Sequence, residues 1–243
     1  MNMSDLKTRL LNSPHLKDIV FNADAHTYFV RGEQYYGYTG LIGKYKQPFD
    51  KEGMSKYVAF RDGKTQEEVL AEWAQGLQDS IDYGTPVHNA ADDLINTGEI
   101  HPDYEIEMES ILASLSDLGL TPLLGEYLIF NDEMKRASSI DLICVDENGT
   151  LVVCDYKTPA KGIKFDAYKN KKMLYPLSNI EDSTYNHYSL QISLYIRELA
   201  KLGFDVDPIG YILYIRESQR HIYPTTPLFD EVNKLIQIES FNK

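Results

Sequence analysis

The spacing of apolar residues predicts a regular order of helices and strands from residue 84 onward. Some segments repeat apolar residues at helical spacing, and others alternate apolar and polar residues or carry short apolar runs, as strands do. Gly98, Gly119 and Gly203 mark the ends of three helical segments. Predicted helices cover residues 85–96, 103–118, 184–202 and 228–239, and predicted strands cover 123–130, 137–145, 151–157, 209–215 and 221–224.

The first 82 residues predict a hairpin followed by helices. Two aromatic-rich runs, 26–30 and 34–36, flank the turn Arg31-Gly32-Glu33, which is typical of a β-hairpin. We therefore expect residues 1–82 to form a hairpin and helical extension, packed on a core of residues 83–243 in a mixed α/β fold. Helical spacing in the extension covers 39–46, 51–61 and 65–80.

Acidic residues stand at the adjoining ends of two predicted strands. Asp141 lies in one strand, and Asp155-Tyr156-Lys157 ends the next. Because strand side chains alternate between faces, Asp155 and Lys157 project to the same side, and Asp141 can reach them across the hairpin. Two carboxylates and an ammonium at the end of an apolar hairpin are costly to bury without a function. This set suits a divalent cation, with the lysine beside the water that the cation activates.

Further ligands for such a cation stand nearby in the predicted fold. His88 on the predicted helix 85–96 is a candidate, although a single histidine there is more often a structural residue. We consider three interpretations of Glu126: a further metal ligand, an acid that supports the ligands, and an exposed strand residue. An imidazole, two carboxylates and the Tyr156 carbonyl favour Mg²⁺ or Mn²⁺, and the imidazole favours tolerance of Mn²⁺.

Charge is unevenly distributed along the chain. The net charge of −13, from 24 basic and 37 acidic residues, argues mildly against a non-specific nucleic-acid binder. Segment 157–172, however, contains six lysines opposed only by Asp166, which is typical of a solvated loop or of a rim that attracts phosphate. Lys161 and Lys164 are candidate phosphate contacts, as is Arg136. Connections as long as 161–183 tend to be functional or mobile.

A polar stripe marks the long predicted helix 184–202. His187, Gln191 and Tyr195 are spaced by four residues and share one side of that helix. The stripe is either the polar margin of an amphipathic helix or an amide and a phenol that face the predicted site. Both interpretations remain open at this point.

Composition excludes several classes of protein. No apolar run approaches the length of about 20 residues that a membrane helix needs, and the first residues have no apolar signal-peptide core. We expect a soluble, cytoplasmic protein that does not contact membranes. Cys144 and Cys154, the two cysteines, stand on adjacent strands, and we expect small buried hydrophobic residues rather than a disulfide. The sequence has no P-loop, nucleophile elbow, H-E-x-x-H or dinucleotide fingerprint.

The ordered motifs resemble the PD-(D/E)xK nuclease superfamily, and more narrowly its RecB-like members, including phage-encoded ones. The resemblance covers residues 84–215 and implies an αβββαβ restriction-endonuclease-like core. It also implies roles for individual residues. His88, Asp141, Asp155 and the Tyr156 carbonyl match the metal ligands, Lys157 matches the catalytic lysine, and Gln191 with Tyr195 match the motif that contacts DNA or braces the site. The matching motifs are Gly84-x-x-x-His88, Ser138-x-x-Asp141, Asp155-x-Lys157-Thr158 and Gln191-x-x-x-Tyr195.

The resemblance implies a Mg²⁺- or Mn²⁺-dependent DNA nuclease using one or two ions. We expect a bacterial or phage-encoded exonuclease that acts in DNA recombination, DNA repair or phage DNA metabolism. Its substrate would be single-stranded DNA or duplex ends, and a helicase or recombinase would be a further partner. The alternatives are a structure-specific or single-strand endonuclease with the same site, and a protein of this fold that binds DNA or a partner without cutting. Ser138 departs from the glycine often found in the family, and two cysteines cannot hold the iron–sulfur cluster of some relatives.

Overall fold

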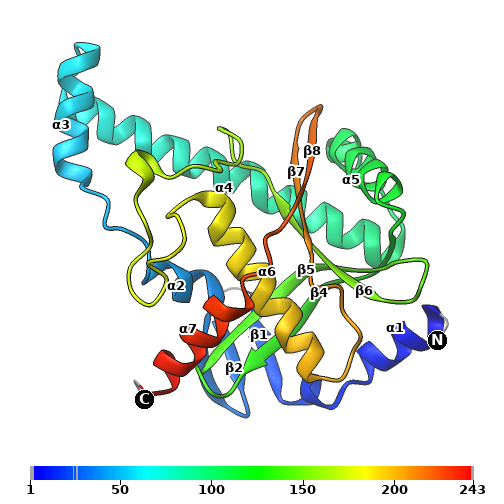
Figure 1. The fold of residues 1–243 in the computed structure, drawn as a ribbon. Coiled ribbons are helices and arrows are strands. Elements are labelled where there is room, and N and C mark those ends of the chain that lie inside the picture. The colour runs from blue at the N-terminus through cyan, green and yellow to red at the C-terminus, as the bar shows by residue number, and fades with distance from the viewer. Residues whose placement is uncertain (1–2, 24, 26, 242–243) are drawn as a thin grey trace.

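The computed structural model describes residues 3–23, 25 and 27–241, so His26 of the predicted hairpin lies outside the described residues. The fold is a mixed α/β arrangement in which helices cover both faces of one eight-stranded sheet (Figure 1). The prediction of a mixed α/β fold is therefore confirmed. None of the helices in this part of the chain is both long and apolar enough to cross a membrane.

The sheet combines parallel and antiparallel pairs. Its strand order is β1-β2-β3-β5-β6-β7-β8, and β4 pairs with β5 outside this path. The pairs β3–β5 and β6–β7 are parallel, and the other pairs are antiparallel. The strands are β1 (Ile19–Asn22), β2 (Thr27–Val30), β3 (Glu33–Gly37), β4 (Thr121–Asn131), β5 (Arg136–Val145), β6 (Leu151–Lys157), β7 (Tyr211–Arg216) and β8 (Gln219–Pro224).

Two groups of helices enclose the sheet. The longer helices are α1 (Met3–Leu11), α2 (Tyr38–Gly43), α3 (Lys51–Asp62), α4 (Gln66–Thr97), α5 (Glu105–Asp117), α6 (Thr184–Lys201) and α7 (Phe229–Phe241). Residues of α1, α2, α6 and α7 pack in the core on one face, whereas residues of α4 and α5 pack on the other. Short 3₁₀ turns lie at Pro14–Lys17, Pro102–Tyr104 and Tyr168–Asn170.

Strand β6 separates the two cores as its alternation predicts. Leu151 and Val153 pack in the core beneath α6 and α7, whereas Val152, Cys154 and Tyr156 pack beneath α4 and α5. Cys144 and Cys154 are both buried free thiols, so the prediction of small buried residues is confirmed.

The prediction of separate helices at 65–80 and 85–96 is wrong. Helix α4 is continuous over 32 residues, begins with a capping box at Thr65 and contains Pro86 in its interior. A proline inside a helix costs about 3 kcal/mol. Burial of Val87, Leu94 and their neighbours against the sheet offsets that cost, because burying a Val or Leu side chain contributes about 1.5–3 kcal/mol. The expected boundary between residues 82 and 83 therefore falls inside a helix.

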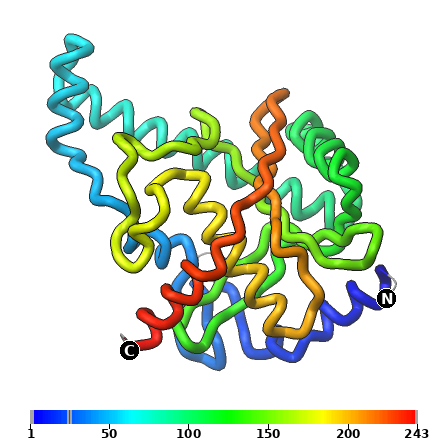
Figure 2. The backbone as a smooth tube through the Cα atoms, viewed as in Figure 1, coloured from blue at the N-terminus to red at the C-terminus, as the bar shows by residue number. Residues whose placement is uncertain are grey.

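The N-terminal extension continues the sheet of the core. The predicted hairpin is present as β2–β3, and β3 pairs with β5 in parallel. Helix α1 and strand β1 were not predicted. Helix α3 and the first half of α4 project away from the body as an arm (Figures 1 and 2). Only Ser55 and Ala59 of α3 are buried, so the arm contributes little to the core.

Candidate metal centre

The site lies where strand β5 changes its pairing partner. On one edge of β5, Arg136 and Ala137 pair with β3, and residues 142–145 pair with β6. Residues 138–141 lie between these two regions. Strand β6 separates from β5 after Cys154, while its other edge stays paired with β7 as far as Lys157. The separation of β5 and β6 opens a space at Asp141, at the end of β6 that carries the acid-x-Lys triplet.

Asp141 is held at this separation by the neighbouring backbone. The Tyr156 N–H donates a hydrogen bond of 3.1 Å to Asp141 Oδ2. On the other edge of β5, the pairs Gly125–Leu142 and Tyr127–Ile140 place Glu126 opposite Asp141. Glu126 has a φ of 50°, a left-handed conformation that is costly for a residue with a side chain. A strained acid opposite a second acid is typical of a functional site.

Helix α4 brings His88 to the same place. His88 Nδ1 lies 3.5 Å from Asp141 Oδ2, and the imidazole is hydrogen-bonded to the Tyr156 backbone. The His88 and Tyr156 rings meet edge to face with centroids 5.7 Å apart. Gly84, one turn earlier, allows the close approach of α4 to β6, because a Cβ there would lie 2.9 Å from Thr158 Oγ1.

One ligand atom from each of His88, Glu126 and Asp141 lies within 4.8 Å of the others. This donor set of one imidazole and two carboxylates fits a divalent cation such as Mg²⁺ or Mn²⁺. The set shares His88 and Asp141 with the sequence-based prediction and adds Glu126, while the predicted ligand Asp155 lies beside it. Glu126 was predicted only as one of three options for its position.

Asp155 and Lys157 form an ion pair beside these ligand atoms. Asp155 is fully buried, and the Lys157 Nζ contacts its Oδ2. The ammonium also lies 5.0 Å from the centre of the Tyr188 ring on α6. Tyr188 was not among the predicted site residues. Its position one turn before Gln191 on the polar stripe was the available signal.

Like charges perturb the carboxyl groups of the site. Burial, followed by the charge of Asp141, raises the pKa of Asp155 to about 6. The same two causes raise the pKa of Glu126 to about 7, although its side chain is exposed to solvent and the charges there are partly screened. Burial also raises the pKa of Asp141. The three carboxyl groups outnumber the Lys157 ammonium beside them, and a bound cation would balance the remaining negative charge.

The surroundings shift the pKa values of His88 and Lys157 in opposite directions. Burial, assisted by the positive charge of Lys157, lowers the pKa of His88 to about 4, so the imidazole is neutral and able to coordinate a metal. Burial alone would also lower the pKa of Lys157. The carboxylates of Asp155 and Asp141 outweigh burial and raise it above its ordinary value. Lys157 is therefore a cation near neutral pH.

Helix α6 supports the site through a chain of hydroxyl and amide groups. The Gln191 Nε2 donates to the Tyr195 hydroxyl over 2.5 Å, and that hydroxyl lies 3.0 Å from Ser138 Oγ on β5. Tyr195 is buried and Gln191 is partly exposed. His187 instead forms a 2.6 Å contact with Asp182. These hydrogen bonds show how Gln191 and Tyr195 brace β5. They also use the Ser138 hydroxyl, which a glycine at this position would not have.

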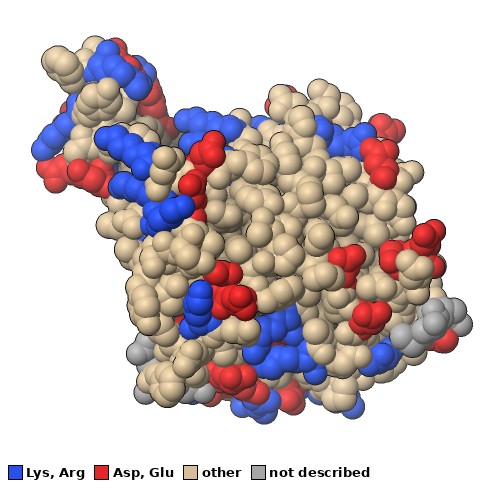
Figure 3. Space-filling model, in the orientation of Figure 1, with Lys and Arg blue, Asp and Glu red and all other residues tan. Residues whose placement is uncertain are grey.

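The three basic residues predicted to contact DNA lie in different surroundings. Arg136 is buried and forms an ion pair of 3.0 Å with Glu239, so it is engaged away from the site. Lys161 and Lys164 are exposed on the loop that follows β6. Figure 3 shows Lys and Arg side chains gathered over α3 and this neighbouring loop. The second half of the loop is anchored on the body, since Leu174 N donates to Tyr45 O over 2.7 Å.

In comparisons with known proteins, no family model matches the chain, and no curated protein sequence matches it.

Proposed function

We propose that this chain is a metal-dependent nuclease that hydrolyses phosphodiester bonds in DNA, and that it acts as an exonuclease. The observation that carries the proposal is the meeting of His88, Glu126 and Asp141 ligand atoms within 4.8 Å. The buried Asp155–Lys157 pair lies beside them. The resemblance of the ordered motifs to PD-(D/E)xK nucleases supports the same conclusion, as does the order helix, three strands, helix, strand between α5 and β7.

His88, Glu126 and Asp141 would hold Mg²⁺ or Mn²⁺, and Asp155 would complete the acidic wall. A bound divalent cation supplies Lewis acidity toward the phosphate and lowers the pKa of a bound water. A neutral imidazole and ionised carboxylates are the forms that coordinate metals.

Lys157 would act on the attacking water and on the phosphate. Because its neighbouring carboxylates hold it in the charged form, it is suited to orient the water and to offset the negative charge that develops on the phosphate. The hydrogen bonds of Tyr195 brace β5 through Ser138 and hold Gln191 in place. The partly exposed Gln191 amide would contact the strand being cut.

The proposal is tested by digestion of end-labelled linear DNA and closed circular DNA with Mn²⁺, with Mg²⁺ or with EDTA. Metal-dependent loss of linear DNA alone, abolished in Asp141→Asn, supports the exonuclease. Cleavage of the circle would replace it by an endonuclease with the same site. Absence of cleavage of either DNA, in protein shown to bind Mn²⁺, would contradict the proposal.

A further inference from the structure

A row of five aromatic rings crosses the sheet edge beside the metal centre. Tyr214 and His221 have ring centroids 5.8 Å apart, and His221 stacks on Tyr223 at 5.9 Å. Phe165 meets Tyr223 edge to face at 5.1 Å and stacks on Tyr185 at 4.7 Å. The rings come from β7, β8, the loop after β6 and the first turn of α6.

Strand register connects this row to the candidate catalytic residues. Lys157 pairs with Tyr214, which pairs with His221, and these three residues form one line across β6, β7 and β8. Two strand spacings separate the ends of such a line by about 10 Å. Paired residues project on the same face of a sheet, so the rings lie on the Lys157 side.

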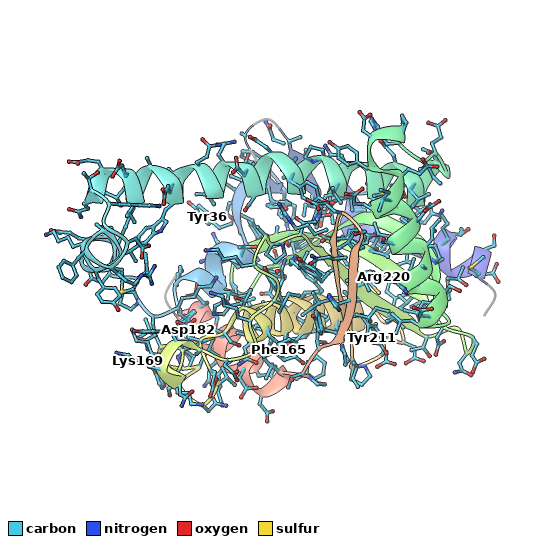
Figure 4. The ribbon with its side chains drawn as sticks, turned by 90° about the horizontal axis from the view of Figure 1, so that it is seen from above. Tyr36, Phe165, Lys169, Asp182, Tyr211 and Arg220 are labelled. Carbon is cyan, nitrogen blue, oxygen red and sulfur yellow. The ribbon has the colours of Figure 1, made fainter. Side chains whose placement is uncertain are left out.

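The next line across the sheet has the same arrangement. Asp155 pairs with Ile212, and Ile212 pairs with Tyr223. Figure 4 shows Phe165 on the loop next to the β7–β8 hairpin, where its ring meets that of Tyr223. The row therefore starts beside the acid-x-Lys triplet and leads away from it along the edge strand.

The row is open to solvent on one side. His221 is exposed and Phe165 is 45% exposed, whereas Tyr185 and Tyr223 are half-buried. Tyr214 is buried, so it supports the row, and the other four rings supply its open surface. The Tyr185 hydroxyl donates a hydrogen bond of 2.8 Å to the Pro224 carbonyl, which fixes that ring against β8. Rings held by their neighbours with faces or edges left in solvent form a surface on which a flat ligand can stack.

Positive charge accompanies the rings. Lys161 and Lys164 are exposed, and neither forms an ion pair with another described residue. The Lys164 carbonyl accepts a hydrogen bond of 3.0 Å from the Tyr185 N–H, which places the backbone of this lysine beside the row. Aromatic rings interleaved with unpaired lysines are the combination that binds single-stranded nucleic acid.

We infer that this row is a binding subsite for the unpaired bases of a DNA strand whose phosphate backbone enters the metal centre. The inference rests on the proposed function and names its substrate as single-stranded DNA. Stacking needs a free base face, and a duplex covers both faces of each interior base. The row therefore favours a frayed end or a single strand over intact duplex.

The test measures binding without cleavage. A single-stranded DNA of about 12 nucleotides, a length within the range of such grooves, carries 2-aminopurine and is titrated with protein in EDTA. We expect Phe165→Ala and Tyr223→Ala each to weaken binding about tenfold and to lower the quenching that stacking causes. Phe165→Trp should keep both the affinity and the quenching. The matched control is Phe241→Ala, which removes a ring that is 80% exposed at the end of α7.

The outcomes separate the inference from the proposed function. Three results would each overturn the inference. The first is unchanged binding in Phe165→Ala and Tyr223→Ala, the second is an equal loss of affinity for blunt duplex DNA in these variants, and the third is no binding of the single strand by the wild type. If the wild type cuts DNA with Mn²⁺ while these variants bind normally, only the inference fails. If binding depends on the rings but no DNA is cut in any metal, the inference stands and the nuclease proposal fails.

Discussion

The Tyr156 N–H donates a hydrogen bond to the Asp141 carboxylate across the gap where β5 and β6 separate. In a regular ladder the Tyr156 amide would bond to a backbone carbonyl of β5. Here it orients an acid, because the β5–β6 ladder ends at Cys154, while β6 continues along β7 on its other edge. The separation of the two strands places Asp141 and the Asp155-Tyr156-Lys157 triplet beside His88. The site is therefore a consequence of strand topology as well as of the residues themselves.

Replacement of His88 tests its role as a ligand. In His88→Ala, removal of the imidazole leaves an oxygen-only site, and Mn²⁺ tolerates nitrogen ligands better than Mg²⁺ does. We expect activity to fall and the ratio of Mn²⁺- to Mg²⁺-supported activity to decrease. His101→Ala, which removes a surface histidine at the Pro102–Tyr104 turn, is the control. An unchanged ratio in His88→Ala would show that His88 does not contact the metal.

The metal-free protein should become less stable as pH rises through the titration of Glu126. Its pKa is raised to about 7 when folded, whereas an unfolded glutamate titrates near about 4.3. Between these values the folded state holds a proton that the unfolded chain releases, so the free energy of unfolding falls with increasing pH. Because Glu126 is exposed and solvent screens its charge, the effect should not exceed about 1 kcal/mol.

Glu126→Gln isolates this contribution. In EDTA at pH 8 the variant should melt about 2–4 °C above the wild type, and below about pH 4, where the glutamate is protonated in both states, the two melting temperatures should converge. Thermal unfolding followed by circular dichroism measures both. Equal stabilisation at the two pH values would mean that charge repulsion at Glu126 is not the cause.

A close contact beneath β7 can be tested through glycine replacements. A Cβ at Gly210 would lie 2.7 Å from the Val153 carbonyl oxygen, whereas nothing lies within 4 Å of a Cβ at Gly76 in α4. Gly210→Ala should cost about 1–3 kcal/mol, as overpacking does. Gly76→Ala should add about 1 kcal/mol through helix propensity. Denaturant unfolding of both variants measures the difference, and a neutral Gly210→Ala would contradict the packing described here.

The order of helices and strands after residue 84 was predictable because each element buries a simple periodic face. The alternation in β6 predicted which side chains meet which core, and Asp155 and Lys157 do project together. Helix α4 was not predictable as one element, because Gly84 and Pro86 break helices in most sequences. Only the packing of the following residues on the sheet reveals why the helix continues.

The candidate ligand set was only partly predictable for a related reason. Glu126 faces Asp141 through its left-handed backbone and the register of β4 on β5, neither of which is visible in the sequence. The engagement of Arg136 by Glu239 depends on the last helix folding back across the sheet, a contact between residues 103 positions apart.

The most direct test of the metal-centre proposal measures Mn²⁺ binding and DNA cleavage on the same protein preparations. The proteins are the wild type, Lys157→Ala, Asp141→Asn and the control Lys201→Ala, which removes an exposed lysine at the end of α6. Calorimetric titration and digestion of end-labelled linear DNA supply the two readouts. We expect Lys157→Ala to bind Mn²⁺ with nearly wild-type affinity but not to cut, Asp141→Asn to lose both functions, and Lys201→Ala to keep both. Full cleavage by Lys157→Ala, or full Mn²⁺ affinity in Asp141→Asn, would contradict the proposal.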